Sequence, residues 1–163
     1  MAIAIRAGVL LGVLVTIWQF VMGFTGWYKD PVLMNVFFLV IVFEIVVLLW
    51  ALQKTAPTST YGAQVVNGLV FSLIASAVLF CSSLVFTTVA FPHYFEEMNA
   101  MQVKALQAQG LSEAAIQSQI AAAAAMQTPL MNALSGVIGT VVTALVVTCV
   151  AAIFWRKKTV AVV

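Results

Sequence analysis

The chain has 163 residues, of which 64% are hydrophobic and only 7% are charged, and its mean hydropathy is +1.13. Soluble domains are about 45–50% apolar and about 25% charged, so these proportions exclude a water-soluble globular fold and indicate a membrane protein. The net charge of +2, without any basic stripe, also excludes nucleic acid as a partner.

Four hydrophobic segments are each longer than the ~18 residues that a transmembrane helix requires. In chain order they cover about residues 7–26, 32–52, 62–91 and 129–155. The first resembles a signal peptide because Arg6 precedes it, but it is long enough to span and no cleavage site follows. We therefore predict an all-α polytopic membrane protein, with one four-helix transmembrane domain over residues 1–163.

The connection between the third and fourth spans is much longer than the other two. Tyr94, Met98 and Met101 begin an apolar stripe at helical spacing. Gly110 is typical of a helix C-terminus, and Ser112 is a good N-cap for a second helix. The pattern predicts a helical hairpin over residues 93–127.

Basic residues predict the orientation of the chain. Arg6, Lys54 and the cluster Arg156-Lys157-Lys158 fall on one side of the predicted bundle, whereas Lys29 and Lys104 fall on the other. Cytoplasmic loops carry the excess of Lys and Arg, so both termini are expected in the cytoplasm and the hairpin on the extracytoplasmic side.

Glu44 is the only charged residue in the four hydrophobic segments. It lies ten residues before Lys54, and ten helical residues span about 15 Å, half of a ~30 Å hydrocarbon core. An ionisable group near the bilayer midplane is costly, on the order of 3 kcal/mol, and is a candidate functional site. The polar residues expected near its depth are Thr16, Ser72, Ser76 and Thr143. Three interpretations stay open: a hydrogen-bonded structural acid, a contact with a ligand or another subunit, and a proton or ion site.

Small residues recur every four positions along the fourth span, at Gly136, Thr140, Ala144 and Thr148, and on the first span at Gly8 and Gly12. Such faces let helix backbones approach closely in lipid. They indicate either packing inside this bundle or an interface with another membrane subunit.

No phosphate-binding loop, GxSxG or HExxH motif is present in the sequence. His93, Glu96 and Glu97 have spacings that share a helix face, but one histidine with two carboxylates is a weak metal signal. Cys81 and Cys149 are expected at different depths, too far apart for a disulfide. We therefore expect no enzymatic activity, no cofactor and no metal site.

Several short motifs resemble a known family. They are Tyr61-Gly62, Phe91-Pro92-x-Tyr94, Gly110-Leu111-Ser112-Glu113 and the final basic cluster Arg156-Lys157-Lys158. The chain resembles an uncharacterised bacterial membrane family, domain of unknown function 4199, over this region, while the first two spans match only in hydrophobicity. The resemblance implies a four-span protein of the bacterial inner membrane and brings no known activity or site residues.

The sequence as a whole favours a non-catalytic integral membrane protein. We expect an accessory or structural subunit, or a scaffold, that packs in the lipid bilayer against other membrane proteins or against itself. The alternative is a small proton- or ion-coupled transporter or channel that uses Glu44.

Overall fold

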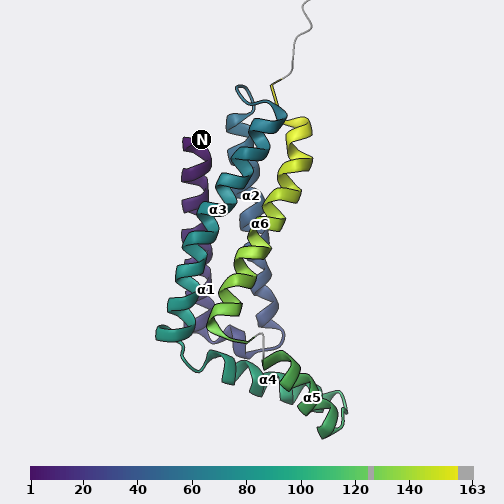
Figure 1. Ribbon diagram of the computed structural model, residues 1–163. Helices are drawn as coiled ribbons and strands as arrows, with labels where there is room; N and C mark the ends of the chain where they lie inside the picture. Colours follow the sequence, from purple (N-terminus) through teal and green to yellow (C-terminus); the bar gives the residue numbers. More distant parts are fainter. Residues whose placement is uncertain (125–126, 158–163) are drawn as a thin grey trace, which may run out of the picture.

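The computed structural model describes residues 1–124 and 127–157. Four helical segments of this described chain are long and apolar enough to cross a membrane: Ala2–Thr25, Leu33–Thr55, Tyr61–Ala90 and Pro129–Phe154. They run side by side as a bundle (Figure 1), and no strand occurs among the described residues. The predicted all-α, four-span fold class is confirmed, and the chain is a multi-pass membrane protein. Residues 125–126 of the expected hairpin and Lys158 of the basic cluster lie outside the described residues.

The first helix, α1 (Ala2–Thr25), ends at Gly26, whose φ of 71° is left-handed. Glycine adopts this conformation without a steric penalty, so the helix stops here and the chain reverses. A short 3₁₀ helix, η1 (Trp27–Lys29), forms the turn. The carboxylate of Asp30 then accepts hydrogen bonds from the backbone N–H groups of Val32 and Leu33, at 2.8 and 3.0 Å, which starts the next helical segment.

The second span begins as a 3₁₀ helix, η2 (Leu33–Phe38), and becomes the α-helix α2 only over Leu39–Thr55. In its first turn, the side chain of Asn35 donates a hydrogen bond to the carbonyl oxygen of Pro31 at 3.1 Å.

The helix α3 (Tyr61–Val85) is the centre of the bundle, because it packs against both α1 and α6 (Pro129–Phe154), whereas α2 packs less extensively. Threonine caps start both central helices: Thr60 accepts from the Ala63 N–H, and Thr128 accepts from the Met131 N–H. At its far end α3 widens into a π-helical turn, η3 (Phe86–Ala90).

Two further helices, α4 (Tyr94–Ala108) and α5 (Glu113–Ala124), lie between the third and fourth spans and contact each other. They lie across the end of the bundle opposite the start of α1 and the end of α6 (Figure 1). Gly110, with φ of 75°, ends α4 in a Schellman arrangement in which the Leu111 N–H donates to the Leu106 carbonyl oxygen at 3.3 Å.

Candidate functional site

Glu44 lies on α2 and is turned into the bundle. The residue is 6% exposed, and its carboxyl group lies close to the backbone of Ala144 on α6. Its Oε1 atom is buried and has no hydrogen-bond partner among the described residues. A buried polar atom without a partner is uncommon in a folded protein, so this carboxyl group has unused hydrogen-bonding capacity.

The polar residues expected near Glu44 lie on several helices. Ser72 is fully buried on α3, and its hydroxyl donates to the Leu69 carbonyl oxygen at 2.9 Å. Ser76 is 3% exposed, and its Oγ has no partner within the described chain. Thr143 is half-buried on α6. The structure gives none of these three residues a hydrogen bond to Glu44 within the described chain.

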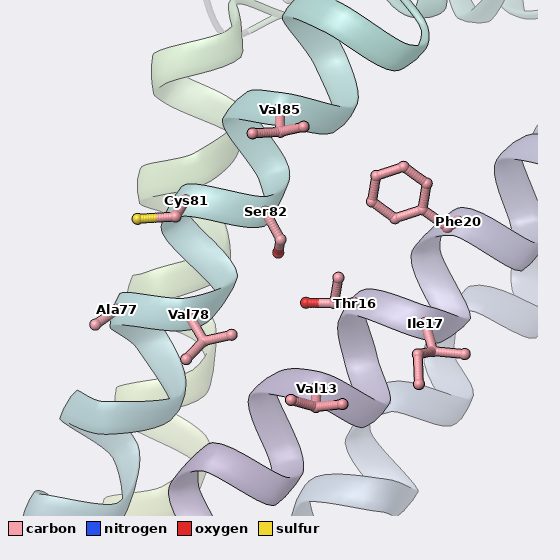
Figure 2. Close-up of a pocket in the computed structure, with 9 residues that line it drawn as sticks. All are labelled: Val13, Thr16, Ile17, Phe20, Ala77, Val78, Cys81, Ser82 and Val85. Carbon is pink, nitrogen blue, oxygen red and sulfur yellow. The ribbon is translucent and has the colours of Figure 1, made fainter.

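Thr16 faces a different part of the bundle. It lines an open groove of about 680 Å³ between α1 and α3, where Figure 2 shows its side chain directed toward Ser82. The Thr16 hydroxyl donates to the Gly12 carbonyl oxygen at 2.7 Å, and the Ser82 hydroxyl donates to the Leu79 carbonyl oxygen at 3.1 Å. Both hydroxyls are therefore occupied locally, and the other groove residues are almost all apolar. The groove can hold a hydrocarbon chain, and Cys81 contributes a free thiol to its lining.

The small residues divide into two groups. Gly8 and Gly12 pack against α3: a Cβ on Gly8 would lie 2.6 Å from the Phe71 carbonyl oxygen, and one on Gly12 would lie 2.6 Å from Val78 Cβ. Three small residues of α6 are buried inside the bundle, namely Thr140, Ala144 and Thr148. Gly136, in contrast, is exposed, and no described atom lies within 4 Å of the position of a Cβ there.

A carboxamide cluster that was not predicted from the sequence joins three helices at one end of the bundle. Gln64 of α3 is fully buried, and its Nε2 donates to the carbonyl oxygens of Leu52 at 2.8 Å and Trp155 at 2.7 Å. Its Oε1 accepts from the hydroxyl of Thr55 at 2.6 Å. The bonded groups of Leu52, Thr55 and Trp155 all lie near helix ends, where backbone carbonyl groups lack intrahelical partners. The sequence feature that could have predicted this cluster is the presence of Gln64 and Asn67 in an otherwise largely apolar span.

At the opposite end, Glu97 attaches α4 to the turn after α1. Its Oε1 accepts a hydrogen bond from Lys29 Nζ at 2.8 Å, and its Oε2 accepts a short hydrogen bond from the Tyr28 hydroxyl. The hydrogen bond from Lys29, and to a smaller extent that from Tyr28, holds the pKa of the Glu97 carboxyl below its usual value. Burial and the neighbouring Glu97 carboxylate raise the pKa of Tyr28, so its phenol stays neutral. Nearby, His93 Nδ1 lies 2.9 Å from Glu96 Oε2 in an exposed pair.

Comparison with known protein families gives a match over most of the chain. The sequence profile described as "Protein of unknown function (DUF4199)" matches residues 6–157. The chain belongs to this family. The resemblance drawn from the motifs is confirmed, and the match extends through the first two spans, which the motifs did not cover. No curated protein and no solved structure shows significant similarity to this DUF4199 protein.

The buried carboxyl group of Glu44 is an ionisable group inside the second span of this DUF4199 protein. Thr148 lies one helical turn beyond Ala144, and its Oγ1, like Glu44 Oε1, is buried without a partner among the described residues. Such a set can accept a hydrogen bond, a proton or a cation. The two ends of the bundle, in contrast, hold polar groups whose hydrogen bonds connect helices to one another.

Proposed function

We propose that the chain is a non-catalytic membrane subunit or scaffold that packs against other membrane helices, either those of another protein or those of a second copy. The observation that carries this proposal is the outward position of Gly136 and Gly139 on α6. No described atom lies within 4 Å of a Cβ placed at either glycine.

The other helical glycines in contact with the bundle have a different environment. At Gly8, Gly12, Gly23 and Gly68, an added Cβ would lie 2.1 to 2.6 Å from a neighbouring atom, so the fold itself requires glycine at these positions. At Gly136 and Gly139, packing within the described chain does not require a glycine. A glycine in the middle of a helix is destabilising by roughly 0.5–1 kcal/mol relative to alanine, and an outside helix that packs closely on α6 would offset that cost.

The residues around these glycines support a helix-binding surface. Ser135, Gly136 and Gly139 are all exposed, and the larger side chains of Ile138 and Val142 flank them with exposures of 63% and 54%. Small and large exposed residues therefore alternate along this part of α6. Small residues three and four positions apart, flanked by branched apolar residues, are the pattern with which membrane helices approach one another closely.

Substitution of Gly139 by leucine tests the proposal. A Cβ at this position meets no neighbouring atom within 4 Å, so Gly139→Leu is expected to leave the fold intact and to abolish the assembly. The matched control is Gly62→Leu, the same substitution at a glycine of α3 that also has no neighbouring atom within 4 Å of an added Cβ. Particle mass and co-purifying proteins are measured after extraction in mild detergent. A monomeric parent without a partner, or an assembly that Gly139→Leu leaves unchanged, contradicts the proposal.

A second candidate function is proton- or ion-coupled transport through Glu44. The specific observation in its favour is the buried Oε1 without a hydrogen-bond partner in the described part of the chain. Under this alternative, Glu44→Gln abolishes flux in proteoliposomes while helicity by circular dichroism is unchanged. Ser72→Ala serves as the control, because its hydroxyl is already bonded within α3. Absence of flux in the parent, or equal flux in Glu44→Gln, rules the transport function out.

We further propose that the protein lies in the bacterial inner membrane with both termini in the cytoplasm, and that α4 and α5 are extracytoplasmic. Arg6, Lys54 and Arg156 support this orientation, because they lie toward the end of the bundle opposite α4, and basic residues remain on the cytoplasmic side. Alkaline phosphatase fused after Gly110 should be active, and the same enzyme fused at the C-terminus should be inactive. The reverse activities would overturn the assignment.

A further inference from the structure

A second cavity, of about 220 Å³, lies at the end of the bundle that α4 crosses. Its walls come from parts of the chain that are distant in sequence, including Gln19 and Met22 of α1, Phe86 of η3, Met98 of α4 and Asn132 of α6. The π-helical turn η3 helps to form it, because Phe86 is 2% exposed and is part of the wall. Single π-helical turns inside α-helices are frequent at functional sites.

The walls combine flat apolar surfaces with two carboxamides. The rings of Phe86 and Tyr94 lie 5.4 Å apart, centroid to centroid, in an edge-on arrangement, and methionine side chains complete the apolar surface. Asn132 is held in place by the hydrogen bond from its Nδ2 to Ser83 Oγ, 3.0 Å long. Gln19 forms no side-chain hydrogen bond within the described residues. A few placed polar groups in a mainly apolar cavity are typical of small-molecule sites.

The charge of the walls determines the class of ligand. No described residue that lines the cavity is charged. Glu97, which bonds to the lining residue Tyr28, is paired with Lys29 at 2.8 Å, so neither charge is free to neutralise a ligand. Burial raises the pKa of the Tyr94 phenol, which therefore also stays neutral. An anionic phospholipid headgroup would lose its hydration here without gaining a counter-charge, so a neutral ligand is favoured.

The size of the cavity and the side on which it opens narrow the range of neutral ligands that it can hold. A water molecule occupies about 30 Å³ in the liquid, so the cavity has room for roughly seven waters, or one substituted six-membered ring. Phe37 and Phe38 of η2 form another part of the wall and are 40% and 61% exposed, so this side borders the lipid. A ligand with one ring and an apolar tail would place its ring inside and its tail in the bilayer.

We propose that this cavity binds the oxygen-substituted ring of a neutral, membrane-dissolved amphiphile of the quinone class. The Gln19 carboxamide donates a hydrogen bond to a ring carbonyl oxygen, the aromatic and thioether side chains contact the ring faces, and α4 covers the site. The site uses none of the residues on the outer face of α6, so it is independent of the proposed assembly.

Binding of decylubiquinone tests this inference. The protein is placed in nanodiscs of phosphatidylcholine, and bound quinone is quantified at increasing concentrations against empty nanodiscs. We expect saturation at one quinone per chain. Met98→Trp, which fills the cavity, and Gln19→Leu, which removes the donor, should each bind at least about tenfold more weakly, the effect of one lost hydrogen bond to a buried group.

Met101→Trp is the matched control, because Met101 lies on α4 beside Lys104 and lines a different surface. It should bind as the parent does. If Met98→Trp does not retain the parent helicity, Gln19→Leu decides the outcome. Partitioning without saturation, parent-like affinity in Gln19→Leu, or displacement of the quinone by phosphatidylglycerol at equal concentration overturns the proposal.

Discussion

The close contact between Gly68 of α3 and Thr148 of α6 leaves no room for a larger side chain at position 68, so we expect Gly68→Ala to destabilise the bundle. A Cβ on Gly68 would lie 2.1 Å from Thr148 Oγ1 and 2.7 Å from its Cγ2. Thr148 is fully buried, so its side chain has no free space to move into. Overpacking of this kind is destabilising by about 1–3 kcal/mol. The gain in helix propensity from glycine to alanine, up to about 1 kcal/mol, offsets part of that loss in Gly68→Ala.

The control Gly136→Ala isolates the steric part of the effect, because it changes the same residue type in a helix with no described atom within 4 Å. We expect the free energy of unfolding of Gly68→Ala to be about 1–3 kcal/mol below that of Gly136→Ala, measured by circular dichroism during titration of dodecyl sulfate into detergent micelles. Adding Thr148→Gly to Gly68→Ala restores the space, so the two substitutions should couple favourably, by about 0.5–3 kcal/mol. Equal stabilities of the two alanine variants, or simple additivity in the double variant, would refute the reasoning.

Two other predictions concern the ends of the bundle. Gln64→Leu removes the side-chain donor of the Trp155 carbonyl oxygen and one of the two side-chain donors of the Leu52 carbonyl oxygen. The free energy of unfolding should therefore fall by about 1–3 kcal/mol in the same titration. The exposed Gln119→Leu should leave it unchanged, and equal effects of the two would contradict the role of the cluster. At Glu97 the pKa is lowered in the folded protein, so its contribution is fully present above the ordinary value of 4.5 and is lost as the pH falls through the lowered pKa. The stability difference between the parent and Glu97→Gln should therefore shrink from about pH 7 to about pH 3, and a difference that does not vary with pH would count against the attachment of α4.

Hydropathy predicted the four spans because the tendency of a segment to leave water depends mainly on the residues of that segment. The 3₁₀ start of the second span was not predicted, because hydropathy does not distinguish a 3₁₀ helix from an α-helix. The Gln64 cluster was not predicted either. Its partners are 12 and 91 residues away in the sequence, and only the packing of three helices brings their carbonyl oxygens to one point.

For the candidate site, the sequence predicts the depth of a side chain in the membrane but not the direction in which it points. Counting residues from the helix ends predicts how deep a side chain lies, but the direction in which it points depends on which neighbours its helix packs against. Thr16 was expected near Glu44 on the basis of depth, yet its hydroxyl bonds within α1 beside the groove that α1 forms with α3. Direction had to come from the structure.

The small residues of α6 show why direction matters for function. They form one class in the sequence, because each makes the helix thinner at its position. In the bundle, Thr148 fills the space that Gly68 leaves, whereas Gly136 and Gly139 face away from every described neighbour. Lipid chains gain nothing specific from a glycine, while a helix backbone does, because it can approach closely enough to make extensive van der Waals contact. The inward group therefore accounts for how this chain folds, and the outward group is the part of the same helix on which an assembly with another membrane helix would depend.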